Sequence, residues 1–326
     1  MVGCGRIGSE IADDPLGKGI ESHAGAYTES PLTTLVAVCD RDPDRARRCG
    51  TRWGVAARYQ DCSEMLAEQQ PDLVSVCTPD ETHFDVLRTV LSAPSVRGVL
   101  AEKPLALSLA EAEEVARLAS ERGVRLAVNY VRRYAGSHRR LKEFVTAGGI
   151  GEVQAVGGYY TKGTIHNGTH WFDLARFLVG DVARVWGRDA LREDGNDPTF
   201  DAFLEFETGA AGHLQACRTG AYTIFEMDLV GTKGRVQLLD SGHVFRTFEL
   251  ADSPRYSGHR ALVPVEGLSG GFEDALLNAV EDLARAVEAG IEPLCSAADG
   301  IAALNIALGV RASTVSGALI DLQEVR

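Results

Sequence analysis

The sequence of 326 residues has few basic residues relative to acidic ones: 33 Lys and Arg stand against 46 Asp and Glu, a net charge of −13. Phosphate backbones and anionic membrane surfaces are held mainly by Lys and Arg. This balance argues against a nucleic-acid partner and against adsorption to a membrane. The sequence also lacks any apolar run near the roughly 18 residues that a membrane-spanning helix needs.

Cysteine spacing excludes another set of functions. None of the seven Cys lies three residues from another, so no zinc or redox C-x-x-C pair is present. An odd number of Cys without a secretory signal fits a reducing compartment, and we expect the protein to be cytoplasmic. The sequence shows no internal repeat. Its length predicts two domains, and its 45% hydrophobic and 24% charged residues are typical of globular proteins.

In the first part of the chain, short apolar runs alternate with helical patterns. The expected buried strands are 35–39, 72–77, 98–101 and 125–128. The expected helices are 61–69, 82–93 and 108–122, the last marked by a capping box of Ser108 and Glu111. Such alternation predicts an α/β fold with a doubly wound parallel sheet, covered by helices on both faces. We expect this domain to span residues 1–128.

The pattern changes near Asn129. Longer strand-like segments follow at 153–160, 200–207, 211–218, 226–231, 235–239 and 244–250, with turn signals between them. Helices are expected at 136–147, 169–178, 272–289 and 297–316. This predicts a second α/β domain over residues 129–326, built on an open and mostly antiparallel sheet.

The segment Gly3-Cys4-Gly5-Arg6-Ile7-Gly8 is a G-x-G-x-x-G motif. In a dinucleotide-binding loop the first glycine permits a tight turn, the second lets the pyrophosphate approach, and the third lets the next helix pack closely. The helix N-terminus then supplies N–H groups to the phosphates. A glycine-rich turn without a nucleotide is the alternative. The surrounding βα pattern, and the acidic Asp40 at the end of the next strand, favour dinucleotide binding.

The same region indicates which dinucleotide binds. A carboxylate at Asp40 accepts hydrogen bonds from the ribose hydroxyls of NAD and repels the 2′-phosphate of NADP. Arg41 and Arg45 complicate the assignment, since either could pair with that phosphate. Their alternative role is a solvated helix start. We expect NAD, with NADP as the alternative.

Two irregularities accompany the glycine loop. Only Met1 and Val2 precede it, although the first strand of such a sheet usually has about five residues, so we expect the native start to lie upstream. Asp40 lies 32 positions after Gly8, whereas the usual spacing is about 20. We assign the excess to an insertion at 13–22, either a flap near the cofactor or a surface loop.

A more specific signature appears at Ala101-Glu102-Lys103-Pro104-Leu105. Together with the glycine loop, Thr78-Pro79 with His83, and Asn167-Gly168-Thr169-His170-Trp171-Phe172-Asp173, it resembles the Gfo/Idh/MocA family, which includes glucose–fructose oxidoreductase and inositol dehydrogenases. The resemblance covers essentially the whole chain. It implies a Rossmann domain, a second domain whose open sheet often forms a dimer interface, a nicotinamide cofactor, and a sugar, sugar-nucleotide or cyclitol substrate. We accordingly expect a homodimer or homotetramer.

The resemblance also implies roles for individual residues. Lys103 and His170 are the positions that family members use at the reacting carbon. The expected cofactor-binding residues are Gly3, Gly5, Arg6, Ile7, Gly8, Asp40, Arg41, Thr78, Pro79, His83, Glu102 and Lys103. Family members often carry Asp four residues before the histidine, whereas this chain has His166 there. That departure leaves the usual Asp–His proton relay in doubt.

The chemistry suits these residue types. The cofactor carries the hydride, while the protein supplies orientation and a path for the proton. An imidazole such as His170 serves as acid or base near neutral pH, and Lys103 can donate a hydrogen bond to the reacting oxygen. Asp173, three residues later, would orient the imidazole. Alternatively, Lys103 forms a surface ion pair, and His170 and Asp173 form a purely structural pair.

The remaining candidates surround these positions in sequence. His166 is either a proton shuttle or substrate donor, or simply part of the loop. The spacing of His166 and His170 could suit a metal, but Gly168 lies between them and no Glu or Cys completes the ligand set, so no metal is expected. Expected substrate-binding residues are Asn129, Tyr130, Arg132, Tyr160, Lys162 and Asn167, with domain packing or surface charge as the alternative. Trp171 and Phe172 are expected in the core.

These observations predict an NAD-dependent sugar or cyclitol oxidoreductase. One alternative is a regulator of the same fold that binds the dinucleotide or a sugar without catalysis, because fold does not determine function. A purely binding protein would not need both Lys103 and His170. The other alternative is a dehydrogenase of a non-sugar substrate such as a dihydrodiol or biliverdin.

Overall fold

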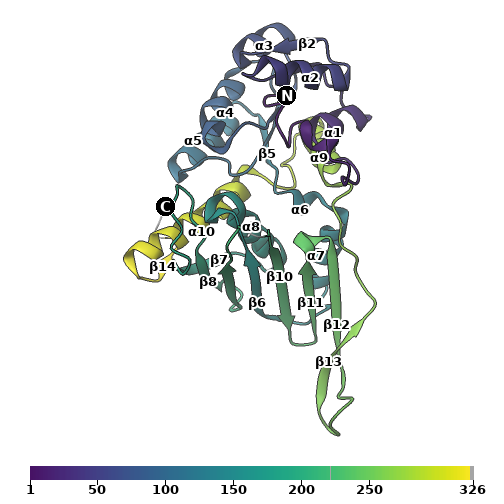
Figure 1. The fold of residues 1–326 in the computed structure, drawn as a ribbon, viewed down its shortest axis with the longest axis vertical. Coiled ribbons are helices and arrows are strands. Elements are labelled where there is room, and N and C mark those ends of the chain that lie inside the picture. The colour runs from purple at the N-terminus through teal and green to yellow at the C-terminus, as the bar shows by residue number, and fades with distance from the viewer. Residues whose placement is uncertain (221, 324–326) are drawn as a thin grey trace. The chain divides into compact units, whose positions relative to one another are not determined.

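The computed structural model describes residues 1–220 and 222–323 (Figure 1). The chain divides into two compact units. The first takes Met1–Ala135 and Phe272–Ile301, and the second takes Gly136–Gly271 and the chain from Ala302 onward. The expected boundary after residue 128 lies close to the first division. The sequence pattern did not assign 272–301 to the first unit, because an amphipathic helix does not reveal which sheet its apolar face covers.

The first unit is built on a parallel sheet. Its strands are β1 (Ala37–Cys39), β2 (Ala57–Tyr59), β3 (Leu73–Val76), β4 (Gly98–Ala101) and β5 (Arg125–Val128). Val2 bridges Cys39 and Val76 in parallel, and thereby joins the pair β1–β2 to the trio β3–β4–β5. The Val2 position is thus central, which gives the strand order of a Rossmann sheet. The predicted doubly wound sheet is confirmed.

Helices cover this sheet in two groups. The first unit contains α1 (His23–Glu29), α2 (Pro43–Trp53), α3 (Cys62–Gln69), α4 (His83–Ser92), α5 (Leu109–Glu121), α6 (Val131–Tyr134), α9 (Ala275–Ala289) and the start of α10 (Ala297–Ser316), with short 3₁₀ turns η1 (Glu10–Asp13) and η2 (Asp80–Thr82). Contacts group α1 with α2 and α9, and α4 with α3 and α5. The Ser108 hydroxyl caps α5 by accepting the Glu111 N–H at 3.3 Å, as its sequence predicts.

The helix after the glycine loop is interrupted by an insertion. The N–H groups of His23 and Ala24 donate to the carbonyls of Ile7 and Gly8 at 3.1 and 2.9 Å. In an uninterrupted α-helix these carbonyls would accept from residues 11 and 12. Residue 23 therefore stands where residue 11 would, and twelve residues, 11–22, are inserted. Without them the 32-residue spacing from Gly8 to Asp40 becomes 20, the usual value.

The insertion is held against α2 and the loop before α9. Glu10, at its start, pairs with Arg48 at 3.2 Å and with Arg45 at 3.8 Å. The Arg52 guanidinium donates to the Ala12 carbonyl at 2.6 Å. Further along, the Ile20 N–H donates to the carbonyl of residue 273 at 3.2 Å. These contacts place the segment on the surface of the first unit.

The second unit contains a sheet in the order β13-β12-β11-β10-β6-β9-β8-β7-β14. The strands are β6 (Val153–Tyr160), β7 (Val182–Arg188), β8 (Asp201–Phe206), β9 (Ala211–Ala216), β10 (Phe225–Gly231), β11 (Gly234–Leu239), β12 (Val244–Asp252), β13 (Arg260–Val265) and β14 (Ile320–Asp321). The neighbours β6 and β9 run parallel, while the other pairs are antiparallel. The predicted mostly antiparallel sheet is confirmed.

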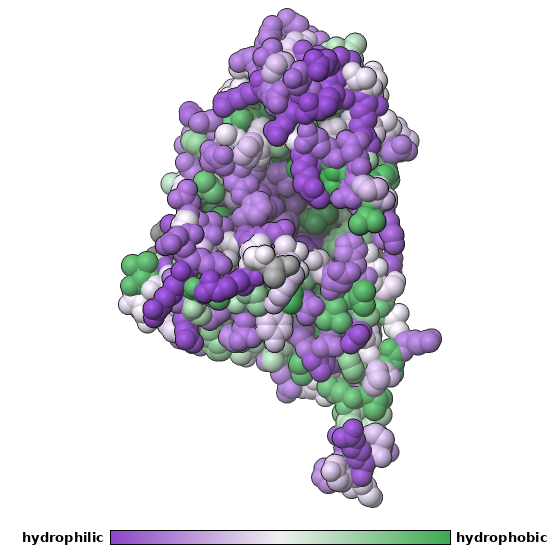
Figure 2. Space-filling model, in the orientation of Figure 1, coloured by the Kyte–Doolittle hydropathy of each residue, from purple (hydrophilic) through white to green (hydrophobic). Residues whose placement is uncertain are grey.

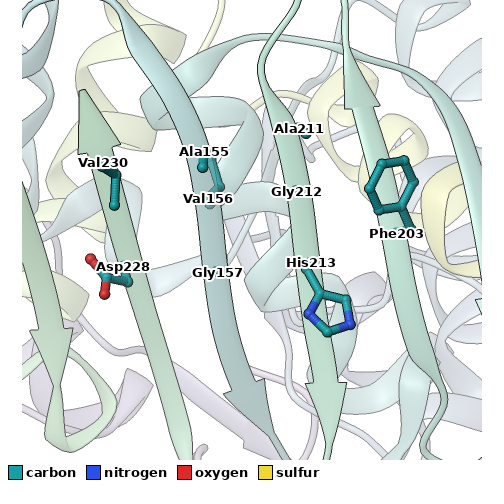
Figure 3. A pocket seen from close by; sticks show the side chains of 9 residues that line it. All are labelled: Ala155, Val156, Gly157, Phe203, Ala211, Gly212, His213, Asp228 and Val230. Atoms are coloured by element: carbon teal, nitrogen blue, oxygen red, sulfur yellow. The ribbon is translucent and has the colours of Figure 1, made fainter. Parts of the chain in front are cut away.

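One face of this sheet is covered by α7 (Gly136–Thr146), α8 (Gly168–Val179) and most of α10, and the strands alternate accordingly. Trp171 and Phe172 of α8 are fully buried, as predicted, and the Trp171 indole donates to the Glu226 carbonyl at 3.0 Å. Helices from the described residues leave the other face open. Figure 3 shows Phe203, His213 and Asp228 on that face; Phe203 and His213 lie on the neighbouring strands β8 and β9, and β6 separates His213 from Asp228 on β10.

At the edge of this sheet, the ends of β12 and β13 pair only with each other and extend as a two-stranded hairpin (Figure 1). Hydrophobic residues gather along its sides, and its tip is hydrophilic (Figure 2). Across residues 1–220 and 222–323, no helix combines the length and apolar character needed to cross a bilayer.

Candidate functional site

The three glycines of the loop differ in what surrounds them. A side chain at Gly3, which has φ +92°, would lie 2.5 Å from the Cys77 carbonyl oxygen, and one at Gly8 would lie 2.2 Å from the Gly3 carbonyl oxygen. Both positions therefore exclude a Cβ. At Gly5 the nearest atom is a guanidinium nitrogen of Arg45 at 3.9 Å, so that side of the loop is open. This is the side on which a pyrophosphate would approach the backbone.

Asp40 lies at the carboxyl end of β1, beside the loop. Its Oδ2 accepts the Cys4 N–H at 2.8 Å, and its Oδ1 accepts the Asp42 N–H at 2.9 Å. The carboxylate is therefore fixed at the position where an adenosine ribose is bound in this type of sheet. Arg45 pairs with Glu10 at 3.8 Å and with Asp42 at 3.9 Å. The guanidinium that could have bound the 2′-phosphate of NADP is therefore already paired with two carboxylates.

Three other expected cofactor residues flank the loop. Arg6 is exposed and pairs with Asp14 of the insertion at 3.8 Å. Ile7 is partly buried and packs against the core cluster beneath the loop. Arg41 is exposed at the start of the segment before α2.

Polar residues follow three adjacent strands of the first unit. Thr78 comes after β3, Glu102 and Lys103 come after β4, and Asn129 comes after β5. Ligands bind at the carboxyl ends of strands in such sheets. Thr78 Oγ1 and Asn129 Oδ1 are buried and have no hydrogen-bond partner in the described residues. Such atoms are costly to leave unpaired, and they indicate a ligand that supplies the missing partners.

His83 joins two of these segments. Its side chain is fully buried, with Nδ1 at 2.6 Å from the Pro104 carbonyl oxygen and Nε2 at 2.8 Å from the Thr78 carbonyl oxygen. Both partners only accept, so each bond is satisfied when that nitrogen carries a proton. His83 thus ties the Thr78–Pro79 segment to the segment after Lys103, whose peptide bond to Pro104 is cis.

Glu102 is a buried carboxylate beside Lys103. Burial by itself would raise its pKa, but a hydrogen bond and the charge of His23, a hydrogen bond from Asn129, and the charge of Lys103 hold the pKa below its ordinary value. Glu102 is therefore ionised at neutral pH. Lys103 itself is buried to the same extent, at 8% exposure each.

Sequence reasoning missed His23. Its Nε2 lies 2.8 Å from Glu102 Oε1, although 79 residues separate them. The insertion hid the signal, because His23 follows Gly8 by 15 positions in sequence but by three in the helix register. Counting the glycine-to-Asp40 spacing and removing its twelve-residue excess would have found it.

In the second unit, the predicted histidines lie where a π-helix, η3 (Gly163–Asn167), runs into α8. His166 belongs to η3 and is exposed, while His170 lies in the first turn of α8 and is partly buried. Asp173 lies one turn further along α8 and is 1% exposed. The Asn167 amide donates to the Thr161 carbonyl at 2.7 Å, which ties η3 to the end of β6.

Asp197 holds this histidine segment, and the sequence analysis missed it. Its Oδ1 accepts the Ile165 N–H and its Oδ2 accepts the His166 N–H, both at 2.8 Å. A side chain on Gly163, which has φ +86°, would lie 2.1 Å from Asp197 Oδ2, so glycine is required there. The next residue contributes too, because the Pro198 carbonyl accepts the Thr164 hydroxyl at 2.8 Å.

Tyr160 and Lys162 flank the same segment. Tyr160 is fully buried, and its hydroxyl donates to the Phe200 carbonyl at 2.7 Å and lies 3.0 Å from Thr164 Oγ1. Burial raises its pKa. Lys162 is exposed, in a left-handed conformation with φ 70°. It lines a surface hollow in which cations and carboxylates are balanced, namely with Arg192, Arg218, Glu193, Asp194 and Asp197.

The other expected substrate residues lie at the start of α6. Tyr130 and Arg132 are buried, and the Arg132 guanidinium lies over the Phe272 ring at 5.3 Å from its centroid. Neighbouring Arg133 pairs with Asp299 at 3.0 Å. The described residues contain no group of three or more His, Cys, Asp or Glu that could hold a metal ion.

The first unit fits a nicotinamide dinucleotide. The open side of Gly5 suits a pyrophosphate, the fixed Asp40 carboxylate suits ribose hydroxyls, and the unpartnered Thr78 and Asn129 atoms offer further hydrogen bonds. The second unit supplies two histidines on a segment that a carboxylate holds in place. By residue type, a lysine can stabilise a developing negative charge and a histidine can transfer a proton.

Two models of one protein family match this chain. Residues 1–130 match the model of the Gfo/Idh/MocA oxidoreductase family with an NAD-binding Rossmann fold, and residues 161–237 match the model of the Gfo/Idh/MocA C-terminal domain. The chain is 26% identical to myo-inositol 2-dehydrogenase of Thermotoga maritima, with 100% of this chain and 98% of the relative covered. It is 25% identical to scyllo-inositol 2-dehydrogenase (NAD(+)) of Bacillus subtilis, with 88% and 87% covered.

Solved structures share the fold. Levoglucosan dehydrogenase in complex with NADH matches with a TM-score of 0.81 at 17% identity, covering 98% of this chain and 97% of that protein. At this identity the likeness concerns the fold alone.

Proposed function

Because the chain belongs to the Gfo/Idh/MocA family of NAD-binding oxidoreductases, we propose that it transfers a hydride between NAD and a CH–OH carbon of a sugar, sugar nucleotide or cyclitol. The relatives named as inositol 2-dehydrogenases support this substrate class. The observation that carries the proposal is the conjunction of a dinucleotide loop, the buried pair Glu102 and Lys103, and a histidine segment fixed by Asp197.

The proposal divides the work between the two parts of the chain. Residues 1–128 bind the dinucleotide, and residues 129–326 bind the substrate and form the contact with further subunits. NAD, when bound, supplies the group that accepts or donates the hydride. Asp40 selects NAD over NADP, because its carboxylate is fixed by two backbone N–H groups and would repel a 2′-phosphate.

Lys103 is proposed to stabilise the reacting oxygen. Its ammonium donates a hydrogen bond as negative charge develops there, an interaction that is strong in a site from which water is excluded. The charge of Lys103 is in turn one of the causes that hold the pKa of the neighbouring Glu102 below its ordinary value. His170 accepts the hydroxyl proton during oxidation and returns it during reduction, at an imidazole nitrogen. Asp173, one helical turn away, orients that imidazole.

His166 takes the place at which family members often carry Asp, and we propose that it donates a hydrogen bond to the substrate or passes the proton on. Other substrate contacts are proposed for Tyr130, Arg132, Lys162 and Asn167, whereas Asn129, in the first unit, is assigned to the cofactor through its unpartnered Oδ1. Tyr160 supports them from within the core, through its bonds to Thr164 and Phe200. Because the hollow around Lys162 has as many carboxylates as cations, it has no excess positive charge that would favour a phosphorylated substrate.

The proposal includes a cytoplasmic location and a homodimer or homotetramer that buries the open sheet face. Tyr159, Trp186 and Phe203 are 45%, 39% and 37% exposed, and contiguous exposed apolar patches often mark interaction surfaces. Sedimentation analysis of the wild type and of Phe203→Glu tests the assembly. Dissociation of the variant supports it, and a wild type that sediments as a monomer excludes it.

The catalytic proposal is tested by NADH formation with myo-inositol, scyllo-inositol, levoglucosan and glucosides. Lys103→Met and His170→Asn should each lower kcat about 10²- to 10⁴-fold on the substrate that the wild type oxidises. His259→Asn is the matched control, because His259 is exposed on the hairpin tip outside the site. Full activity in either site variant would remove that residue from the mechanism, and wild-type inactivity on every class would overturn the proposal.

A further inference from the structure

A chain of side-chain hydrogen bonds crosses the buried interior of the first unit. Its centre is His23, which is fully buried. On one side His23 Nδ1 lies 2.9 Å from Ser75 Oγ, and the Ser75 hydroxyl donates to Tyr27 at 3.1 Å. On the other side His23 Nε2 lies 2.8 Å from Glu102 Oε1, and the Asn129 amide donates to the same oxygen at 2.6 Å.

The Glu102 end of this hydrogen-bond network leaves one acceptor unsatisfied. Glu102 Oε1 receives both donors, His23 Nε2 and the Asn129 amide. A carboxylate accepts and does not donate, so the Asn129 amide must turn its nitrogen toward Glu102. Asn129 Oδ1 is then directed away from Glu102, and it is buried without a partner although Asn129 is only 3% exposed.

The unpaired atom is therefore an acceptor, Asn129 Oδ1. Asn129 follows β5, and Glu102 follows the adjacent strand β4, at the edge of the sheet where ligands bind. A matching ligand has to donate, as the ribose hydroxyls and the carboxamide NH₂ of a nicotinamide nucleoside do. A buried acceptor gains most from such a donor, because water no longer competes for it.

We propose that His23 is a positioning residue for the cofactor: by holding Glu102 Oε1, it orients the Glu102 carboxylate and the Asn129 amide so that the acceptor Asn129 Oδ1 faces the donor groups of the nicotinamide nucleoside. This rests on the proposed function only in naming NAD as the ligand. The inserted segment 11–22 preserves the arrangement, because His23 keeps the helix register that an uninterrupted helix would give it.

Charges around Glu102 support the role. The groups that face it are His23 on α1, Lys103 on its own segment, and the Cys77 thiol after β3, whose pKa is raised by burial and by the Glu102 charge. Without His23 the buried carboxylate would lose one of its two hydrogen bonds to Oε1 and would turn toward Lys103 or take up a proton. In either case the Asn129 amide would lose the partner that fixes its orientation.

NADH binding to the full-length protein, followed by nicotinamide fluorescence and calorimetry, tests the inference without turnover. His23→Leu removes the donor to Glu102, and His23→Gln retains an amide N–H at about the same reach. We expect the Kd for NADH to rise at least about tenfold in the leucine variant, and the glutamine variant to stay within about threefold of wild type. His138→Leu, which replaces an equally buried histidine of the second unit, is the control and should leave the Kd unchanged.

A second pair of variants tests the inference even if the leucine variant does not fold. If His23→Leu does not fold, His23→Asn, whose side chain is one methylene shorter than that of Gln, should bind NADH weakly while His23→Gln binds it well. Asn129→Ala should weaken binding too, and combining it with His23→Leu should add little, because both changes remove the same acceptor. Wild-type affinity in a folded His23→Leu or His23→Asn protein would overturn the inference. Failure of the wild type to oxidise any sugar would instead overturn the proposed function, and these binding results would still stand.

Discussion

Asp197 accepts the backbone N–H of His166 at 2.8 Å, although 31 residues separate them along the chain. Its second oxygen accepts the N–H of the preceding Ile165 at the same distance. One carboxylate thus satisfies two consecutive donors at the start of the helical segment that carries both candidate histidines, where helix N-termini leave such donors unpaired. The loop that contains Asp197 is therefore part of the site's support.

Replacing Asp197 should lower kcat without weakening the binding of the cofactor. We expect Asp197→Ala to reduce kcat by about 10- to 100-fold, because a shift of about 1 Å in a proton-transferring group costs about that much. NADH affinity should stay within about twofold, since the dinucleotide residues belong to the first unit. Asp194→Ala, in the same loop, is the control. Steady-state kinetics together with NADH titration separate the two effects, and a variant with normal kcat would show that Asp197 is not needed to place the histidines.

Removing the carboxylate of Asp40 should relax the choice between NAD and NADP. Asp40→Ala takes away both the repulsion of a 2′-phosphate and the acceptor for ribose hydroxyls, so the ratio of NADP to NAD affinity should rise at least about tenfold. Asp44→Ala, whose carboxylate pairs with Arg47 at 2.9 Å, is the matched control and should leave the ratio unchanged. Titration of the two reduced cofactors measures it. An unchanged ratio in Asp40→Ala would place NAD selection elsewhere.

The insertion provides a test of helix register. Deleting residues 11–22 should leave NADH affinity within about threefold of wild type, because His23 then follows Glu10 at its uninterrupted position. Deleting only 13–22 leaves two extra residues and rotates His23 by about 200° around the helix, so this variant should lose NADH binding or stability. NADH titrations and thermal unfolding compare the two deletion variants. Equal NADH affinity and equal stability in both variants would contradict the inferred helix register.

Glu102 should link the stability of the first unit to pH. Its pKa in the folded protein lies below the ordinary value of 4.5, so its ionised form contributes stability that is fully present above that pH and is lost as the pH falls through the folded pKa. Glu102→Gln lacks this contribution. The difference in the free energy of unfolding between wild type and variant should therefore shrink from pH 7 to about pH 3.5. Denaturant unfolding at both pH values measures it, and a gap that widens on acidification would contradict the assigned shift.

Much of the fold was readable from the sequence because its signals are local. The strands at 98–101, 125–128 and 153–160 and the helix at 297–316 lie at their predicted bounds, since each is an apolar or amphipathic run between clear boundaries. The strand β7 (Val182–Arg188) was missed. The exposed positions of β7 carry Arg184, Trp186 and Arg188. Because the apolar Trp186 is among them, the strand does not show the regular alternation of apolar and polar residues that marks a half-buried strand.

The site was only partly readable, and the reason is distance along the chain. The glycine loop, Asp40 and the Glu102–Lys103 pair are marked by local motifs. The bonds from His23 to Glu102 and from Asp197 to His166 join residues 79 and 31 positions apart. Such contacts are created by strand order and loop return, which no short motif encodes. They support the motif residues and were found only in the folded chain.

The central claim, hydride transfer from a CH–OH carbon to NAD, is tested most directly with a substrate deuterated at that carbon. The wild-type protein is incubated with NAD and with inositol, or another sugar that it oxidises, deuterated at the reacting carbon. The mass of the NADH formed is then measured by mass spectrometry. The account predicts one deuterium in each NADH molecule formed, and a loss of this product in His170→Asn. NADH that forms without deuterium, or an absence of labelled NADH across the substrate panel in a protein that binds NADH tightly, would contradict it.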